Sequence, residues 1–405
     1  MKEETMQNKE IIIVGAGASG LIAAVTAARA GARVTVLEQN DRPGKKIGAT
    51  GNGRCNLTNL NTPPDAYRGT DPSFVQEALA QFGVQDTIRF CSELGIYTTN
   101  RNGYLYPRSG QAQSVTDVLC MEAAHLGVRI KTRETVTKIV RKDRWVVYTE
   151  GWHYEGDAVI LANGSKASAI SGSDGSGYAI AEALGHNIVP VYPALTALKC
   201  KGNDFKAWAG VRTEGEITLC INDFPAKSER GELQLTDYGI SGIPVMQLSR
   251  YAIRALHEGC SVRLLVNFLP EFTKEGLNNY LEYRKACCPY KTDKELLTGL
   301  FPDKLIRVLT AKKDLVSAIS AFPLTVREGM DFDKAQVCSG GVATAEVNAS
   351  TMESLLCPGL YFAGELLDID GTCGGYNLQW AWSSGVCAGS HAARTLSDKR
   401  KENAQ

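Results

Sequence analysis

The sequence predicts an α/β protein with a parallel sheet, and three features of the chain support this fold class. The apolar, β-branched residues 11–14 are typical of a buried parallel strand. A G-x-G-x-x-G motif at residues 15–20 follows that strand and opens an Ala-rich helix that ends at Gly31. A second strand–glycine–helix unit begins at residue 359, so we expect both ends of the chain to build one domain.

Each glycine of the motif has a physical task. Gly15 permits a tight turn, Gly17 lets the backbone approach a pyrophosphate, and Gly20 lets the helix pack closely on the strand. The free N–H groups and the dipole at the start of the helix favour phosphate. Glu38 closes the second strand, where a carboxylate accepts hydrogen bonds from both ribose hydroxyls and repels a 2′-phosphate. The pattern therefore predicts a Rossmann-like site for FAD or NAD rather than NADP.

The composition narrows the class of partner. The 405 residues contain 44 Lys and Arg and 44 Asp and Glu, so the net charge is zero. This balance gives no electrostatic footprint for nucleic acid or an anionic membrane surface. The first ten residues are polar and mixed in charge, unlike a signal or transit peptide, and the sequence has no run of 18 apolar residues. We expect a cytoplasmic protein with a small-molecule substrate and without a nucleic-acid or membrane partner. The oligomeric state stays open.

The cysteines and histidines suggest neither a metal site nor a redox centre. The twelve cysteines are scattered and include no C-x-x-C pair, and the five histidines are dispersed. We expect the cysteines to be reduced thiols that lie mostly in the core. No metal ion is predicted.

A loop is predicted directly after the ribose-binding strand. Residues 41–59 are rich in glycine and poor in apolar side chains, which predicts no regular element there. The position of this loop favours contact with the cofactor over a flexible surface role. Arg54 is a candidate for holding a phosphate or a substrate oxygen, and Cys55 is either a thiol near the cofactor or a buried core residue.

The remainder of the first half alternates between helical and strand patterns. A small-residue turn, ANGS, follows the last strand at residues 162–165. The predicted helices cover residues 73–94, 114–126 and 174–185, and the predicted strands cover residues 128–131, 134–140, 145–149 and 157–161.

The character of the sequence changes at Val191 and returns near Ser339. We therefore predict a cofactor domain from residues 1–190 plus 336–405, with an inserted substrate domain at residues 191–335. Near the end of the chain, a helix of small residues is predicted over 378–396. Within the insertion, strands are predicted at residues 194–199, 211–221 and 262–268, and helices at residues 243–257 and 273–309.

Four sequence blocks together resemble a known family. They are IIIVGAGASGLIAA, GKKIGATGNGRCNLTN, DAVILANGSKA with SGSDGSGYAIAEALGH, and SGGVATAEVNASTMES with GLYFAGELLDIDGTCGGYNLQWAWSSGVCAG. The chain resembles the bacterial BaiN/RdsA-type FAD-dependent oxidoreductases, which are aminoacetone-oxidase-like flavoproteins. The resemblance covers nearly the whole chain. It implies non-covalent FAD on a Rossmann-like, two-dinucleotide-binding domain, with an inserted β-barrel and a helical subdomain at about residues 243–310.

The resemblance also implies which residues hold the cofactor. One departure from the family is the turn at residues 162–165, which reads A-N-G-S where A-T-G-G is usual. The implied contacts are Gly15, Gly17, Ser19, Gly20, Glu38 and Gln39 with the ADP half, the Val136 backbone with adenine, Lys46, Thr50, Gly51, Asn52 and Gly53 along the flavin edge, and Gly364, Glu365, Asn377 and Leu378 closing the site.

Three functions follow from these patterns. The first is hydride transfer through flavin N5 to a carbonyl-activated carbon–carbon double bond of a small or steroid-like molecule. A flavin oxidase of an aminoketone or another amine is the alternative within the same class, and a flavin-bearing RNA-modification protein is the alternative from another class. The sequence does not identify the catalytic acid or base, for which Arg54 and Tyr376 are candidates. NAD(P)H is a candidate transient reductant, since the flavin would occupy the one complete G-x-G-x-x-G unit.

Overall fold

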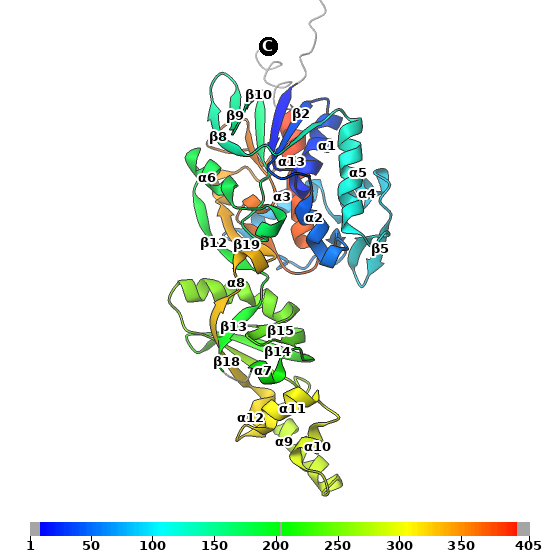
Figure 1. The fold of residues 1–405 in the computed structure, drawn as a ribbon, viewed down its shortest axis with the longest axis vertical. Coiled ribbons are helices and arrows are strands. Elements are labelled where there is room, and N and C mark those ends of the chain that lie inside the picture. Colours follow the sequence, from blue (N-terminus) through cyan, green and yellow to red (C-terminus); the bar gives the residue numbers. More distant parts are fainter. Residues whose placement is uncertain (1–8, 203–204, 395–405) are drawn as a thin grey trace, which may run out of the picture. The chain divides into compact units, whose positions relative to one another are not determined.

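The computed structural model describes residues 9–202 and 205–394. The first eight residues of the polar leader and the last two residues of the helix predicted over 378–396 lie outside this part of the chain. The chain divides into two compact units, Met1–Val191 with Val337–Gln405, and Tyr192–Gln336. Figure 1 shows the elements of each unit. Within the described residues, no helix has both the length and the apolar character needed to cross a membrane.

The first unit is built on a five-stranded sheet with the order β20-β11-β1-β2-β7. The central strand β1 (Glu10–Val14) pairs in parallel with β2 (Arg33–Glu38) and with β11 (Ala158–Leu161). The outer strands β7 (Arg129–Thr132) and β20 (Leu360–Phe362) pair in parallel with β2 and β11. The α/β prediction is therefore confirmed, and strand β20 shows that the far end of the chain completes the sheet.

Two helices from opposite ends of the chain pack against each other beside this sheet. They are α1 (Ala18–Arg29) and α13 (Tyr376–Arg394), which lie side by side in Figure 1. Glycine permits their close approach, because a Cβ on Gly389 would lie 2.5 Å from the carbonyl oxygen of Ala23. The small residues predicted for the last helix thus serve its packing on the first one.

The structure differs from the sequence prediction at two places in this unit. The glycine-rich stretch at 41–59 contains a short helix, which begins after Gly44 in the left-handed conformation. The helix predicted over 73–94 is interrupted at Gly83, whose N–H group is capped by Asp86 at 3.0 Å. The elements of this unit not yet named are α2 (Lys45–Ala49), η1 (Thr50–Gly53), β3 (Thr58–Asn59), β4 (Tyr67–Gly69), η2 (Pro72–Phe74), α3 (Val75–Gln81), α4 (Val84–Glu93), β5 (Thr98–Arg101), β6 (Tyr104–Pro107), α5 (Ala112–His125), β8 (Val136–Arg141), β9 (Trp145–Thr149), β10 (His153–Gly156), η3 (Ala169–Ser171), α6 (Ser176–Ala183), β19 (Val337–Val342), η5 (Thr344–Glu346), η6 (Gly364–Leu366) and β21 (Ile369–Gly371), and β12 (Ile188–Ala194) leads into the second unit.

The second unit contains a closed barrel with the order β13-β16-β15-β14-β17-β18, so the barrel implied by the resemblance is confirmed. The strand predicted over 194–199 is interrupted at Leu195, which has a positive φ of 50°. The helical span predicted over 273–309 is divided where Pro289 and Pro302 occur, because proline disrupts a helix interior. The elements are β13 (Leu198–Lys201), α7 (Phe205–Trp208), β14 (Arg212–Ile221), β15 (Phe224–Leu235), β16 (Gly239–Ser241), α8 (Ile243–His257), β17 (Val262–Asn267), α9 (Lys274–Cys287), α10 (Asp293–Leu297), α11 (Asp303–Thr310), α12 (Leu315–Ser320), β18 (Phe322–Gly329) and η4 (Phe332–Lys334).

Large apolar side chains fill the barrel. Buried and more exposed residues alternate along β17, as expected for a strand with one face toward a core. One hydrophobic cluster contains the fully buried side chains of Ile217, Leu219, Leu264 and Val266. The barrel interior is therefore a packed core rather than a channel.

A buried histidine joins two segments of the first unit. His186 is 2% exposed, its Nδ1 lies 3.1 Å from a carboxylate oxygen of Glu346, and its Nε2 lies 2.9 Å from the Ser354 hydroxyl. The Ser354 oxygen also accepts hydrogen bonds from the N–H groups of Leu356 and Cys357. Although a serine, a histidine and a carboxylate are aligned, the serine is buried and its oxygen is occupied by backbone donors. We therefore interpret the group as structural.

This group predicts a loss of stability in mild acid. Burial lowers the pKa of His186 below its usual 6.5, although the Glu346 carboxylate acts in the opposite direction. Below about pH 6.5, the histidine of the unfolded chain binds a proton more readily than the buried His186 does. The contribution of this group to the free energy of unfolding is therefore complete above about pH 6.5 and is lost as the pH falls through the lowered pKa. Urea unfolding at pH 7.5 and pH 5.5 should show this loss in the wild type and a smaller one in His186→Gln. His153→Gln, which changes an exposed histidine, should keep the wild-type difference. An unchanged pH dependence in His186→Gln would contradict the assignment.

Candidate active site

Four loop segments meet at the carboxyl edge of the parallel sheet. Residues 15–20 follow β1, residues 38–40 end β2, residues 162–165 follow β11, and residues 363–365 follow β20. Backbone hydrogen bonds of 2.8–2.9 Å connect the first residues beyond β1, β11 and β20 to the neighbouring strands. In open α/β sheets, ligands bind at this edge.

The glycine motif has the geometry of a phosphate cradle. Gly15 has a positive φ of 101°, and a Cβ on Gly20 would lie 1.9 Å from the Gly15 carbonyl oxygen. A Cβ on Gly17 would meet no described atom within 4 Å, so the space above the motif is open. The described first turn of α1 carries no acidic residue. The helix itself therefore places no negative charge at the positive end of its dipole, which favours an anionic group.

Glu38 is held at the end of β2. Its side chain is 7% exposed, and one carboxylate oxygen accepts a hydrogen bond of 2.8 Å from the Ala16 N–H group. The other oxygen accepts from the backbone and side-chain nitrogens of Asn40, at 2.8 and 2.6 Å. Two carboxylate oxygens offer about four acceptor positions, and three are occupied, so one remains for a ligand hydroxyl instead of the two expected from the sequence.

Two further predicted residues lie beside Glu38. The Gln39 side-chain amide donates a hydrogen bond to the carbonyl oxygen of Gly172. The N–H group of Glu134 donates to the carbonyl oxygen of Glu38 at 2.9 Å, which brings the first residue of β8, Val136, close to the end of β2. These contacts place both residues beside Glu38 at the end of β2.

The loop that follows α2 has an unusual backbone. Four residues of this loop have positive φ angles: Gly51 (56°), Asn52 (54°), Gly53 (80°) and Cys55 (59°). Asn52 and Cys55 carry side chains in the left-handed region, which is strained, and such strain is often found at binding sites. Residues 50–53 are partly or fully exposed, and Arg54 is exposed. The Thr50 N–H group donates to the carbonyl oxygen of Ile47, so the backbone N–H groups of residues 51–53 and the guanidinium are the candidates for contact with a bound molecule.

Cys55 itself is a buried core residue. Its side chain is fully buried, and burial raises the pKa of its thiol to about 11, although a hydrogen bond with Thr50 acts in the opposite direction. A thiol with such a pKa is protonated at neutral pH and is a poor nucleophile. Of the two sequence alternatives for Cys55, the structure supports the buried one.

The structure brings Lys46 and Glu365 together across 319 positions of the chain. The Lys46 ammonium lies 2.6 Å from one oxygen of the Glu365 carboxylate. The other oxygen accepts hydrogen bonds from the Ser165 hydroxyl at 2.8 Å and from the Cys338 N–H group at 3.1 Å. One carboxylate therefore connects α2, the turn after β11, β19 and η6.

The start of α13 closes this edge of the sheet. The Asn377 side-chain amide is engaged with its own loop, because it accepts from the Gly371 N–H group at 2.8 Å and donates to the Gly371 carbonyl oxygen at 2.9 Å. Gly364 approaches the glycine motif, since a Cβ there would lie 2.6 Å from the Ser19 hydroxyl oxygen. Leu378 is partly buried against the core. The Asn377 side chain therefore shapes the loop, and its backbone remains the candidate for ligand contact.

Tyr376 has its hydroxyl group engaged within the protein. The residue is 6% exposed, and its hydroxyl donates a hydrogen bond of 2.8 Å to the carbonyl oxygen of Asn61. Burial raises the pKa of Tyr376, and the neighbouring Tyr104 and Asp65 add to the effect. The geometry argues against Tyr376 as a proton donor to a substrate.

We predict that Tyr376→Phe lowers stability and leaves turnover nearly unchanged. The variant loses one buried hydrogen bond, which costs about 1 kcal/mol, and keeps the ring. Urea unfolding and steady-state rates on the purified variant would measure the two effects. Turnover reduced more than about a hundredfold, which is typical of losing a general acid, would restore Tyr376 as a catalytic candidate.

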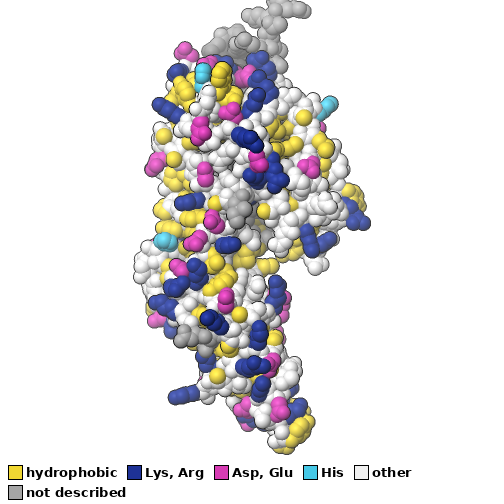
Figure 2. Space-filling model, in the orientation of Figure 1, with side chains coloured by type: hydrophobic (Ala, Val, Ile, Leu, Met, Phe, Trp, Pro, Cys, Tyr) yellow, Lys and Arg dark blue, Asp and Glu magenta, His cyan; other side chains and the backbone are white. Residues whose placement is uncertain are grey.

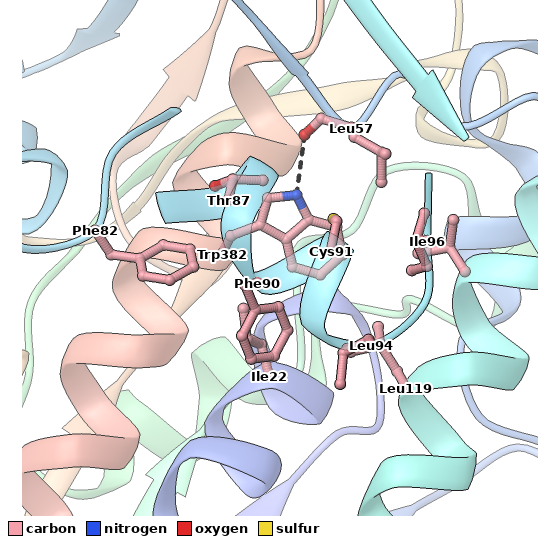
Figure 3. A pocket seen from close by; sticks show the side chains of 11 residues that line it. Ile22, Leu57, Phe82, Thr87, Phe90, Cys91, Leu94, Ile96, Leu119 and Trp382 are labelled. Atoms are coloured by element: carbon pink, nitrogen blue, oxygen red, sulfur yellow. Dashed lines mark hydrogen bonds between the residues drawn. The ribbon is translucent and has the colours of Figure 1, made fainter. Parts of the chain in front are cut away.

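A small apolar cavity lies away from the carboxyl edge. It is lined by side chains of α1, α4, α5 and α13, and the Trp382 indole N–H beside it donates to the carbonyl oxygen of Leu57 at 2.9 Å (Figure 3). Its free volume of about 10 Å³ is close to the minimum for one water molecule. The cavity is therefore a packing gap in the core and not a substrate pocket.

The donors and acceptors at the carboxyl edge fit a dinucleotide, with an open phosphate cradle at Gly17 and a carboxylate at Glu38. Comparison with known proteins agrees, because residues 9–391 match the family described as HI0933-like protein Rossmann domain. The chain belongs to this family. The resemblance stated from the sequence is thereby confirmed.

Two curated relatives and one solved structure align with most of this chain. A 3-dehydro-bile acid delta(4,6)-reductase from Clostridium scindens is 46% identical over 94% of this chain and 98% of the relative. A ribosomal RNA dihydrouridine synthase from Haemophilus influenzae is 33% identical over 94% of this chain and 98% of the relative. Among solved structures, a 3-ketosteroid-delta4-(5alpha)-dehydrogenase from Rhodococcus jostii RHA1 shares the fold, with a TM-score of 0.50 and 16% identity over 97% of this chain and 98% of that chain. This member of the HI0933-like family is an oxidoreductase.

Sequence reasoning missed two residues of the site. Ser165 was noticed only as a departure from the usual turn of the family, and its contact with Glu365 depends on the pairing of β11 with β20. Cys338 contributes its backbone N–H group, for which no side-chain signal exists in the sequence. A hydroxyl-bearing residue in the turn that directly follows a buried parallel strand was the available clue to Ser165.

Proposed function

We propose that this protein is an FAD-dependent reductase of carbon–carbon double bonds conjugated to a carbonyl group, with a small, steroid-like substrate. The observation that carries the proposal is the 46% identity with the bile acid reductase, which extends over 94% of this chain. The fold shared with a ketosteroid dehydrogenase is compatible with it.

The residues at the carboxyl edge would hold FAD without a covalent bond. The pyrophosphate would be held by Gly15, Gly17, Ser19 and Gly20. The ribose would lie at Glu38 and Gln39, and the adenine at the Val136 backbone. The flavin would be surrounded by a second group of residues, which are Lys46, residues 50–53, Gly364, Glu365, Asn377 and Leu378. When bound, FAD supplies hydride transfer at N5.

The protein's own task is to position the substrate and to stabilise charge. During reduction of a conjugated double bond, negative charge grows on the carbonyl oxygen, and preorganised donors lower the barrier. The backbone N–H groups of residues 51–53 and the exposed guanidinium of Arg54 are the donors that we assign to this oxygen, because the Thr50 N–H group donates to the carbonyl oxygen of Ile47. We also propose that the inserted domain at residues 191–335 is a substrate domain, and that NAD(P)H serves as a transient reductant.

A second candidate is reduction of uracil in ribosomal RNA. The dihydrouridine synthases of Haemophilus influenzae and Escherichia coli are 33% and 31% identical to this chain over at least 94% of its length. The uracil double bond that becomes saturated in dihydrouridine is also conjugated to a carbonyl, so the same chemistry would serve. The zero net charge argues against binding of a large polyanion such as ribosomal RNA. Acidic and basic side chains are also interspersed on the face drawn in Figure 2, rather than separated into a basic patch.

An anaerobic half-reaction screen tests the proposal. The purified protein should be yellow, and acid should release intact FAD. The reduced enzyme is then mixed with 3-oxo steroids that carry a conjugated double bond and, in separate samples, with unmodified ribosomal RNA fragments. We expect rapid reoxidation of the flavin by the steroid enones. Reoxidation by the RNA alone would favour the second candidate, and bleaching of the oxidised enzyme by aminoketones with no response to enones would establish an oxidase instead.

A further inference from the structure

The two oxygens of the Glu365 carboxylate have different surroundings. The first oxygen, Oε1, accepts hydrogen bonds from two neutral donors, the Ser165 hydroxyl at 2.8 Å and the Cys338 N–H group at 3.1 Å. The second oxygen, Oε2, faces the Lys46 ammonium at 2.6 Å. Ser165 is fully buried, whereas the side chains of Lys46 and Glu365 are 24% and 18% exposed. One oxygen is thus held by two neutral donors, one of them on a fully buried residue, and the other is paired with a partly exposed ammonium group.

The hydrogen-bond geometry fixes the direction of the Ser165 proton. A serine hydroxyl has one proton to donate, and its oxygen can accept as well. The Ser165 oxygen accepts from the Ala167 N–H group at 3.1 Å, so the turn itself holds the hydroxyl in place. The proton is then directed to Glu365. The neighbouring Cys338 thiol does not compete as an anion, because burial raises its pKa to about 11.

We propose that Ser165 is a positioning residue, which orients the Glu365 carboxylate so that Oε2 is presented to a hydroxyl-bearing part of bound FAD. The inference rests on the function proposed above. Without the Ser165 hydroxyl, Oε1 would keep the Cys338 N–H group but lose its second donor. The serine therefore preorganises a ligand acceptor, and preorganised groups bind more tightly because less freedom is lost on binding.

The test is reconstitution of the apoprotein with FAD, followed by flavin fluorescence. We expect Ser165→Ala and Ser165→Gly to raise the Kd about tenfold, as for the loss of one charge-assisted hydrogen bond. Glu365→Ala should weaken binding at least as much. Adding Ser165→Ala to Glu365→Ala should change the Kd less than about twofold, because no carboxylate is left to orient.

Two further variants separate positioning from general packing. Ser165→Thr keeps the hydroxyl and should restore the Kd to within about twofold of the wild type. Ser249→Ala is a matched control, since Ser249 is also fully buried and its oxygen accepts from the Thr196 N–H group while donating to the Met246 carbonyl oxygen. It should lower the Tm and leave the Kd unchanged.

The outcomes are distinct. Wild-type affinity in both Ser165→Ala and Ser165→Gly would overturn the positioning role while leaving the proposed function intact. A full tenfold effect of Ser165→Ala on the Glu365→Ala background would also overturn it, because the effect would not pass through the carboxylate. Failure of the wild-type apoprotein to bind FAD would overturn the proposed cofactor and this inference together.

Discussion

Gly20→Ala is expected to yield a protein that is purified without FAD and is less stable by about 3 kcal/mol. The added Cβ would lie 1.9 Å from the Gly15 carbonyl oxygen, which is far inside van der Waals contact with backbone. Because neither atom belongs to a flexible side chain, α1 has to move away from the turn after β1. That movement displaces the N–H groups that would face the pyrophosphate. Flavin absorbance of the purified variant and urea unfolding measure the two effects.

Gly17→Ala is the matched control in the same motif. A Cβ at this position would meet no described atom within 4 Å, and the backbone angles of φ −79° and ψ −166° suit alanine. The apoprotein should therefore keep its stability, while FAD affinity falls because the methyl group occupies the space of the pyrophosphate. Equal FAD content in both variants and the wild type would remove the motif from the cofactor site.

Glu38→Ala should weaken FAD binding by about 1.5–3 kcal/mol, or roughly 10- to 100-fold in Kd, through the loss of a charged acceptor for the ribose. The structure adds a second consequence, since the buried carboxylate also accepts from the Ala16 N–H group and from Asn40. Leaving the Ala16 donor unpaired should cost about 1–3 kcal/mol of stability. Titration of apoprotein with FAD, together with unfolding of the apoprotein, separates the two losses.

Glu10→Ala provides the comparison for this variant. Glu10 begins β1, at the amino edge of the same sheet, and forms ion pairs with Arg33 and Arg129. Its removal eliminates a carboxylate from the sheet without touching the carboxyl edge, so the FAD affinity should match that of the wild type. Equal dissociation constants for Glu38→Ala and Glu10→Ala would exclude Glu38 from the ligand site.

Much of the fold could be predicted because its signals are local. The apolar run of β1, the glycine motif and the acid at the end of β2 lie within 30 consecutive residues, and each acts on its immediate neighbours. Helix α8 begins and ends where the apolar spacing predicts. The helices predicted over 73–94 and 273–309 were too long, since the extended conformation at Gly83 and the prolines at 289 and 302 divide them.

The sequence by itself determined the fold class and the glycine turn after β1, because glycine, proline and apolar spacing constrain the backbone wherever they occur. The family followed from the resemblance of four motif blocks. Only the tertiary structure decided how the side chains are engaged. It joined Lys46 to Glu365, directed the Ser165 proton to the same carboxylate, and committed the Tyr376 hydroxyl to a distant carbonyl oxygen. The physical reason is that these partners are far apart in the chain. They meet because the parallel strands order the segments at one edge of the sheet, and a hydrogen bond needs about 3 Å between its atoms.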